Sequence, residues 1–211
     1  MEEIIKIFIY IHAFFGGLGL ISGIGSIIVK KGSIPHKRMG KLFSIGMLTS
    51  SFISIPITFM PNHGNTFLCL IGLFTIYLVI SGNQILTFKS KTKASATLID
   101  KTISGSMLTL SITMILIGIY GVFQGITGNI LYLIFGGFGL LLTIKDFIFY
   151  KNFKAIKNGW LKNHVGKMLG AFIASVTAFI VAGLGIGSIL SWILPSLIGT
   201  AYILYWKRKL Q

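Results

Sequence analysis

The sequence predicts an all-α protein: a single integral membrane domain in which seven transmembrane helices form a polytopic bundle. Of its 211 residues, 54% are hydrophobic and 11% are charged, whereas an ordinary soluble domain devotes about a quarter of its residues to Asp, Glu, Lys and Arg. The apolar residues lie in long continuous runs, and a helix needs about 20 mostly apolar residues to cross the hydrocarbon core. Continuous runs exclude a transmembrane β-barrel, whose strands alternate between apolar and polar residues.

Polar or basic segments separate seven apolar runs, and each run predicts one helix. The predicted helices cover residues 4–29, 39–60, 66–88, 102–124, 129–150, 164–190 and 191–206. The last two runs are joined almost without a polar loop, but Trp192 and Pro195 favour a new helix there, because interfacial aromatic residues and first-turn prolines suit helix starts. The chain begins Met1, Glu2, Glu3 without a basic region, so we expect the first run to be retained as a helix rather than removed as a signal peptide.

The cationic residues predict the orientation of the helices. All Lys and Arg residues except Lys6 lie in or beside the first, third and fifth gaps between these helices, or in the C-terminal tail. The positive-inside rule therefore places the N-terminus outside and the C-terminus in the cytoplasm. We expect a bacterial cytoplasmic membrane, with the bilayer and its anionic headgroups as partners. Cations confined to short gaps do not form the basic face of a nucleic-acid-binding fold, so the net charge of +15 does not predict nucleic-acid binding.

Glycine spacing predicts close packing between helices. Glycines recur at four-residue intervals in the pairs Gly19/Gly23, Gly121/Gly125, Gly166/Gly170 and Gly183/Gly187. Small residues at this spacing let helix backbones approach closely in lipid, and we expect packing inside the bundle rather than in a dimer interface. Cys69 is the only cysteine, which excludes an intramolecular disulfide and a thiolate metal cluster.

Polar residues inside the predicted helices are the candidate functional residues, because polar groups are costly in a bilayer and usually face the bundle interior. His12 lies about two turns inside the first helix, where an imidazole needs a hydrogen-bond partner or a ligand. It is therefore the candidate cofactor-binding residue. The structural alternative for His12 is an interhelical hydrogen bond to a Ser, a Thr or a backbone carbonyl, whereas His63 is interpreted as a turn residue.

A second candidate site lies on the predicted cytoplasmic side. It comprises His36, Arg38, Asp146 and His164, of which His36, Asp146 and His164 are candidate metal ligands. About 25 Å of the first helix separates His12 from the cytoplasmic histidines, so the two sites do not share one metal ion. The structural alternatives are an ion pair that neutralises Asp146 and hydrated interfacial positions for the two histidines.

Two further groups of polar residues lie near the same side. Asn83 and Gln84 are predicted near the cytoplasmic end of the third helix, and Asp100 at the start of the fourth.

Several short motifs stand out along the chain. They are His12 with Gly16 to Gly23, Pro35-His36-Lys37-Arg38-Met39-Gly40-Lys41, Ile80-Ser81-Gly82-Asn83, Asp146, the stretch from His164 to Phe179 with Lys167-Met168 and Thr177-Ala178-Phe179, and Trp192 to Ser196 with Gly199. In these landmarks most of the chain resembles a bacterial family of predicted membrane proteins of unknown function. The resemblance implies no established activity, but it implies that His12, His36, Asp146 and His164 recur as one set. The chain departs from the family pattern at Lys37-Arg38, where His is usually followed at once by Arg, and at Asn83, where a larger polar residue is common.

Three functions are compatible with these residues. The leading hypothesis is a membrane redox protein that binds haem b or a quinone, because imidazole pairs are common haem ligands in small bundles. The alternative is a transporter or a lipid- or solute-binding bundle that binds or gates a solute or proton at the cytoplasmic-side His and Asp residues. The third is an intramembrane hydrolase with a divalent metal such as zinc on His36, Asp146 and His164, although the sequence lacks an H-E-x-x-H motif.

Overall fold

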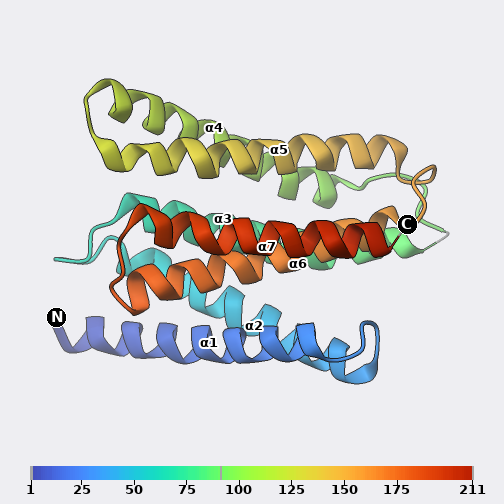
Figure 1. The fold of residues 1–211 in the computed structure, drawn as a ribbon, viewed down its shortest axis with the longest axis horizontal. Coiled ribbons are helices and arrows are strands. Elements are labelled where there is room, and N and C mark those ends of the chain that lie inside the picture. The colour runs from blue at the N-terminus through green and yellow to red at the C-terminus, as the bar shows by residue number, and fades with distance from the viewer. Residues whose placement is uncertain (1, 91, 211) are drawn as a thin grey trace. The chain divides into compact units, whose positions relative to one another are not determined.

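Seven long helices make up most of the part of the chain that the structure describes. The computed structural model describes residues 2–90 and 92–210, which contain no β-strand (Figure 1). The helices are α1 (Glu2–Ile28), α2 (Ile34–Ile57), α3 (Thr66–Gln84), α4 (Leu98–Phe123), α5 (Ile130–Asn152), α6 (Gly159–Ala178) and α7 (Ile189–Lys209), with short helical segments η1 (Ile85–Lys89), η2 (Thr127–Asn129) and η3 (Phe179–Gly183). Within the described chain, seven helical segments are long and apolar enough to cross a membrane. The predicted all-α polytopic membrane fold is thereby confirmed.

Capping residues move several helix ends away from the predicted positions. Helix α2 begins at Ile34 rather than at Met39, because the Ser33 side chain accepts a hydrogen bond from the His36 backbone N–H and caps the helix. Helix α4 begins at Leu98 rather than at Thr102, because Thr97 and Asp100 form a reciprocal capping box. His36 and Asp100 consequently lie in the first turns of helices.

The last two helices are also divided differently from the prediction. Helical structure after α6 ends at Gly183 rather than at Leu190, and α7 begins at Ile189. Gly185 in the intervening segment has a φ of 70°, a left-handed conformation that glycine adopts without a steric penalty. Ser188 then caps α7 by accepting a hydrogen bond from the Ser191 backbone N–H.

The chain forms two compact units. The first unit comprises residues 2–80 and 165–210, and the second comprises 81–90 and 92–164. The single membrane domain expected from the sequence stays a prediction.

In the first unit, α1 and α2 run antiparallel and approach closely through glycine (Figure 1). A Cβ atom at Gly46 would lie 2.8 Å from the Phe15 carbonyl oxygen and 2.8 Å from the Gly19 backbone nitrogen. A Cβ atom at Gly23 would lie 2.6 Å from the Phe172 ring. For Gly19 and Gly23 the expectation of packing inside the bundle is therefore confirmed.

In the second unit, α4 and α5 form an antiparallel hairpin (Figure 1). Gly118 of α4 contacts Leu133, so a side chain there would overlap α5. At the end of the hairpin that carries the cations, aromatic rings pack around Phe88: its centroid lies 5.2 Å from that of Phe149, 5.6 Å from that of Tyr150 and 4.9 Å from that of Phe153. Tyr150 belongs both to this aromatic cluster and to a buried polar network.

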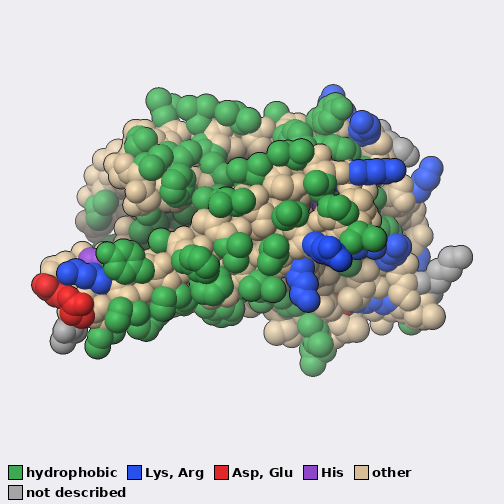
Figure 2. All heavy atoms as spheres, turned by 90° about the horizontal axis from the view of Figure 1, so that it is seen from below, with side chains coloured by type: hydrophobic (Ala, Val, Ile, Leu, Met, Phe, Trp, Pro, Cys, Tyr) green, Lys and Arg blue, Asp and Glu red, His purple; other side chains and the backbone are tan. Residues whose placement is uncertain are grey.

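Large hydrophobic side chains remain on the outside of both units. Ile28 is 77% exposed and Phe123 is 86% exposed. On the face in Figure 2, hydrophobic side chains spread along much of the surface. Such an apolar exterior on long helices is the surface that lipid solvates.

Candidate functional site

The candidate site is a buried polar network in the second unit, and its centre is Asp146. Ser104 lies six residues after the start of α4 and Asp146 six residues before the end of α5. Because the two helices are antiparallel, these positions face each other, and the Ser104 hydroxyl donates a 2.8 Å hydrogen bond to Asp146 Oδ2. Asp146 is 1% exposed and Ser104 is fully buried. A carboxylate is thus enclosed within a membrane-crossing hairpin.

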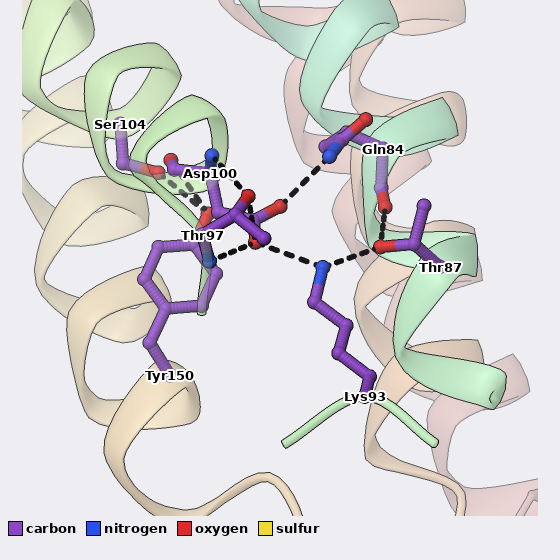
Figure 3. A network of polar contacts seen from close by, with 7 residues as sticks. All are labelled: Gln84, Thr87, Lys93, Thr97, Asp100, Ser104 and Tyr150. Atoms are coloured by element: carbon purple, nitrogen blue, oxygen red, sulfur yellow. Dashed lines mark hydrogen bonds and ion pairs between the residues drawn. The ribbon is translucent and has the colours of Figure 1, made fainter. Parts of the chain in front are cut away.

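Tyr150 extends the network towards the start of α4. It follows Asp146 by one helical turn and therefore lies on the same face of α5. Its hydroxyl oxygen lies 2.9 Å from Ser104 Oγ and donates a 3.2 Å hydrogen bond to the Asp100 backbone carbonyl (Figure 3). The four groups form one row, which we call the hydroxyl row: the Asp146 carboxyl, the Ser104 hydroxyl, the Tyr150 hydroxyl and the Asp100 carbonyl.

The hydroxyl row has more hydrogen bonds than hydroxyl protons. Three hydrogen bonds join its four groups, whereas Ser104 and Tyr150 supply one hydroxyl proton each. With Asp146 ionised, two protons serve two of the three hydrogen bonds at any moment. A proton on Asp146 supplies the third, since the carboxyl O–H then donates to Ser104, Ser104 donates to Tyr150 and Tyr150 donates to the carbonyl. All three hydrogen bonds are made together when Asp146 is protonated.

Asp100 is fully buried in a different environment (Figure 3). Its Oδ2 atom accepts hydrogen bonds from the Thr97 backbone N–H at 2.7 Å and the Thr97 hydroxyl at 2.9 Å, and forms a 2.8 Å ion pair with Lys93 Nζ. Its Oδ1 atom accepts a 3.0 Å hydrogen bond from Gln84 Nε2. Charge-assisted donors at both oxygens stabilise the ionised carboxylate, so we interpret Asp100 as a fixed anion that closes the start of α4.

Lys93 holds the segment before α4 against this anion. Its ammonium also donates a 2.6 Å hydrogen bond to the Thr87 hydroxyl and lies 3.7 Å from the Phe88 ring centroid. The lysine therefore connects the end of the third predicted span with the beginning of the fourth.

A cavity lies beside Tyr150. Its volume is about 310 Å³, enough for several water molecules. It is lined by Ala94, Ser95, Tyr150, Lys151, Asn152, Phe153, Lys154 and Ala155. The cavity lies at the end of the hairpin that carries the cations.

Comparisons with protein families, curated proteins and solved structures find no match. The family resemblance in the sequence landmarks therefore stays a prediction, and the interpretation of the site depends on its geometry.

His12 forms the interhelical hydrogen bond given above as its structural alternative. In the first unit, its Nδ1 atom lies 2.9 Å from the Ser50 backbone oxygen and 3.0 Å from Ser50 Oγ, and the Ser50 hydroxyl donates a 3.0 Å hydrogen bond to the His12 carbonyl. The pair joins α1 to α2.

His36 and His164 also donate from Nδ1 to backbone carbonyls. His36 contacts the Ser26 carbonyl at 3.0 Å in the first unit, and His164 contacts the Gly82 carbonyl at 2.7 Å in the second. Arg38 is exposed in α2. Asp146 and His164 belong to one unit, in which Asp146 accepts a hydrogen bond from Ser104 and His164 donates one to the Gly82 carbonyl.

The metal-ligand set stays a prediction. Across residues 2–90 and 92–210, no group of three or more His, Cys, Asp or Glu side chains lies close enough together to hold a metal ion. This result gives no support to His36, Asp146 and His164 as a zinc or iron centre.

Sequence reasoning missed Ser104, Tyr150 and Lys93 as site residues. One signal was present: Ser104 follows Asp100 by four residues and Tyr150 follows Asp146 by four, so each pair shares a helix face.

Sequence reasoning also counted Lys167 among the interfacial cations, yet its side chain is 2% exposed and its ammonium lies 5.0 Å from the Tyr77 ring centroid in the first unit.

Proposed function

We propose that the protein is a proton-coupled membrane transporter in which Asp146 binds and releases the proton. The observation that supports this function is the hydroxyl row, which makes all its hydrogen bonds only when Asp146 carries a proton. Ionisable residues within membrane helices are costly, and transporters use them as proton relays and solute sites. Proton binding at Asp146 reverses donation between Asp146 and Ser104 and leaves the Tyr150 hydroxyl to donate to the Asp100 carbonyl, which links the charge in α5 to the backbone at the start of α4.

The proposed orientation gives this site access from one side of the membrane. We place the N-terminus outside and the C-terminus in the cytoplasm of a bacterial cell, because the described cations other than Lys6 lie at or near alternate helix ends. Asp146 then lies about 9 Å along α5 from its cytoplasmic end. The cavity beside Tyr150 is the proposed route by which cytoplasmic water exchanges protons with the hydroxyl row.

A redox function receives less support from the geometry. A bis-imidazole haem needs two histidines at one iron. His12 and the Ser26 carbonyl to which His36 bonds are fourteen residues apart along α1, which is about 20 Å of helix. These two imidazoles do not share an iron. An absorption spectrum of the purified protein with a Soret band would restore the haem hypothesis.

Infrared spectroscopy tests the proton site directly. The whole chain contains four acidic side chains, Glu2, Glu3, Asp100 and Asp146, so carboxyl bands are assignable by substitution. We expect a pH-dependent carboxylic C=O band that Asp146→Asn removes and Ser104→Ala shifts. Ser106→Ala is the matched control, because Ser106 is an exposed serine of the same helix that donates only to the Ile103 carbonyl.

Transport is tested in proteoliposomes that contain a pH-sensitive dye, screened against classes of small solutes. We expect at least one solute to drive proton movement with the unmodified protein and with Ser106→Ala. The same solute should drive less than a tenth of that movement with Asp146→Asn, because the asparagine does not titrate. Solute-driven proton movement that persists at full rate in Asp146→Asn would refute the assignment of Asp146.

A further inference from the structure

The carboxyl end of α7 contains a buried hydrogen-bond donor without an acceptor. Among the described residues, the indole Nε1 of Trp206 is the buried side-chain nitrogen or oxygen atom for which no hydrogen-bond partner is found. A buried N–H without an acceptor costs free energy that a bound acceptor recovers. The position of Trp206, in the last turn of a membrane-crossing helix, is where indole rings meet lipid headgroups.

Two ammonium groups of the first unit converge on this indole. Lys31 Nζ lies 5.4 Å from the Trp206 ring centroid, and Lys209 Nζ lies 5.3 Å from it. Lys31 also donates hydrogen bonds to the Ser26 and Ile27 carbonyls at the end of α1, which hold its ammonium in place. Burial lowers the pKa of the Lys31 ammonium. A desolvated ammonium of this kind is stabilised by a nearby anion.

The first unit does not supply that anion from its own side chains. In its described part the acidic residues are Glu2 and Glu3, at the start of α1, whereas Lys31 lies beyond the end of the same helix. About 40 Å of helix separates the two ends. The indole N–H and the two ammonium groups therefore lie together at a place to which the described part of the unit brings no carboxylate.

We propose that Trp206, Lys31 and Lys209 bind the phosphate group of an anionic phospholipid. A phosphate diester offers several acceptor oxygens, which suit one indole N–H and two ammonium groups together. Exposed apolar side chains of the same two helices, Ile28 on α1 and Ile198 on α7, provide apolar surface for the acyl chains. Lysine side chains at a membrane surface reposition easily around a headgroup. The site is independent of proton binding at Asp146.

Native mass spectrometry of the purified full chain tests the proposal, with phosphatidylglycerol as the probe and phosphatidylcholine as the zwitterionic comparison. We expect the unmodified protein to retain phosphatidylglycerol in preference to phosphatidylcholine. Trp206→Phe keeps an aromatic ring for the cations and removes only the N–H, so we expect about tenfold weaker phosphatidylglycerol binding. Lys209→Gln tests the same site at an exposed residue, where a folding defect is not expected.

Lys30→Gln is the matched control, because it removes the same charge from the same loop at an exposed residue that neighbours Lys31. We expect it to change phosphatidylglycerol affinity by less than about twofold. Equal losses in Lys30→Gln and Lys209→Gln, or unchanged affinity in Trp206→Phe, would overturn the site. Inorganic phosphate alone distinguishes the sources of the anion: binding as tight as that of phosphatidylglycerol would overturn the lipid assignment, and weaker binding supports it.

Discussion

At the scale of single residues, two buried aspartates of the second unit differ in what surrounds them. Asp100 accepts hydrogen bonds from Thr97 and Gln84 and pairs with the Lys93 ammonium. Asp146 accepts a hydrogen bond from the Ser104 hydroxyl, and the hydroxyl row is complete when Asp146 carries a proton. The ion pair with Lys93 suggests a structural role for Asp100, and the hydroxyl row supports the proton-binding role that we propose for Asp146.

Removal of the Lys93 charge is expected to destabilise the protein. Lys93→Gln leaves the fully buried Asp100 carboxylate without its cation, and breaking a buried pair in this way costs about 3 kcal/mol. The measurement is the free energy of unfolding in detergent. Lys101→Gln is the control, because Lys101 is an exposed lysine of α4, and its effect should stay within about 0.5 kcal/mol.

A second substitution separates charge from packing at this pair. In the Lys93→Gln background, Asp100→Asn removes the unpaired anion, so we expect part of the lost stability to return. If Lys93→Gln and Lys101→Gln lower stability equally, the ion pair does not stabilise the start of α4.

At the scale of the elements, backbone contact holds the α1–α2 hairpin together. Gly46 faces the backbone of Phe15 and Gly19, where no side chain fits. Helix association in lipid depends on such close packing, because lipid is as apolar as the helix surfaces. His12 and Ser50 add hydrogen bonds across the same pair of helices.

Alanine substitution at two glycines of α2 tests this contact. Gly46→Ala would place a methyl group against the α1 backbone and should lower the free energy of unfolding by about 1–3 kcal/mol. Gly40→Ala is the matched control, since open space surrounds Gly40 and alanine favours a helix. Thermal unfolding in detergent compares the two. Similar melting temperatures for both variants would contradict close backbone packing at Gly46.

At the scale of the whole molecule, the seven membrane-capable helices and the distribution of charge predict the orientation. The segments 58–65, 124–129 and 184–188 contain no Lys or Arg, whereas cations occur in or beside 29–33, 90–97 and 153–158. A chain that crosses the bilayer seven times brings the three uncharged segments to one side and the three cationic segments to the other. The positive-inside rule predicts that the cationic side is cytoplasmic.

Cysteine labelling tests this orientation in a Cys69→Ala background. Single substitutions His63→Cys and Thr127→Cys should react with a membrane-impermeant maleimide in intact cells of a bacterial host. Thr92→Cys and Lys157→Cys should react only after permeabilisation, because they lie in the cationic segments. All four positions are exposed, so a failure to label does not reflect burial. The opposite pattern would invert the proposed topology.

The prediction of helices succeeded where it used a local property and was less accurate where side-chain contacts intervened. An apolar run of sufficient length defines a membrane helix whatever its neighbours are, so all seven helices were predicted. Their ends were less accurate. Ser33 and Thr97 cap helices through hydrogen bonds that extend α2 and α4 into polar sequence, which hydropathy alone does not reveal.

The candidate site was predicted only in part. The sequence identified Asp146 as an ionisable residue within a helix and His12 as a residue that needs a partner, because a polar group surrounded by apolar neighbours is evident from the order of residues alone. It did not identify Ser104 or Tyr150 as partners of Asp146. A serine or tyrosine in an apolar run is common, and its partner depends on how far each helix is rotated about its axis.

By itself, therefore, the sequence determined that the protein is helical, how many times it is able to cross a membrane and where its cations accumulate, since run length and charge position are properties of the chain alone. Only the tertiary structure decided that Asp146 meets Ser104 and Tyr150, and that Lys31 meets Trp206. These contacts join residues that are far apart in the sequence, and they form only when packing sets the rotation and depth of each helix against its neighbour.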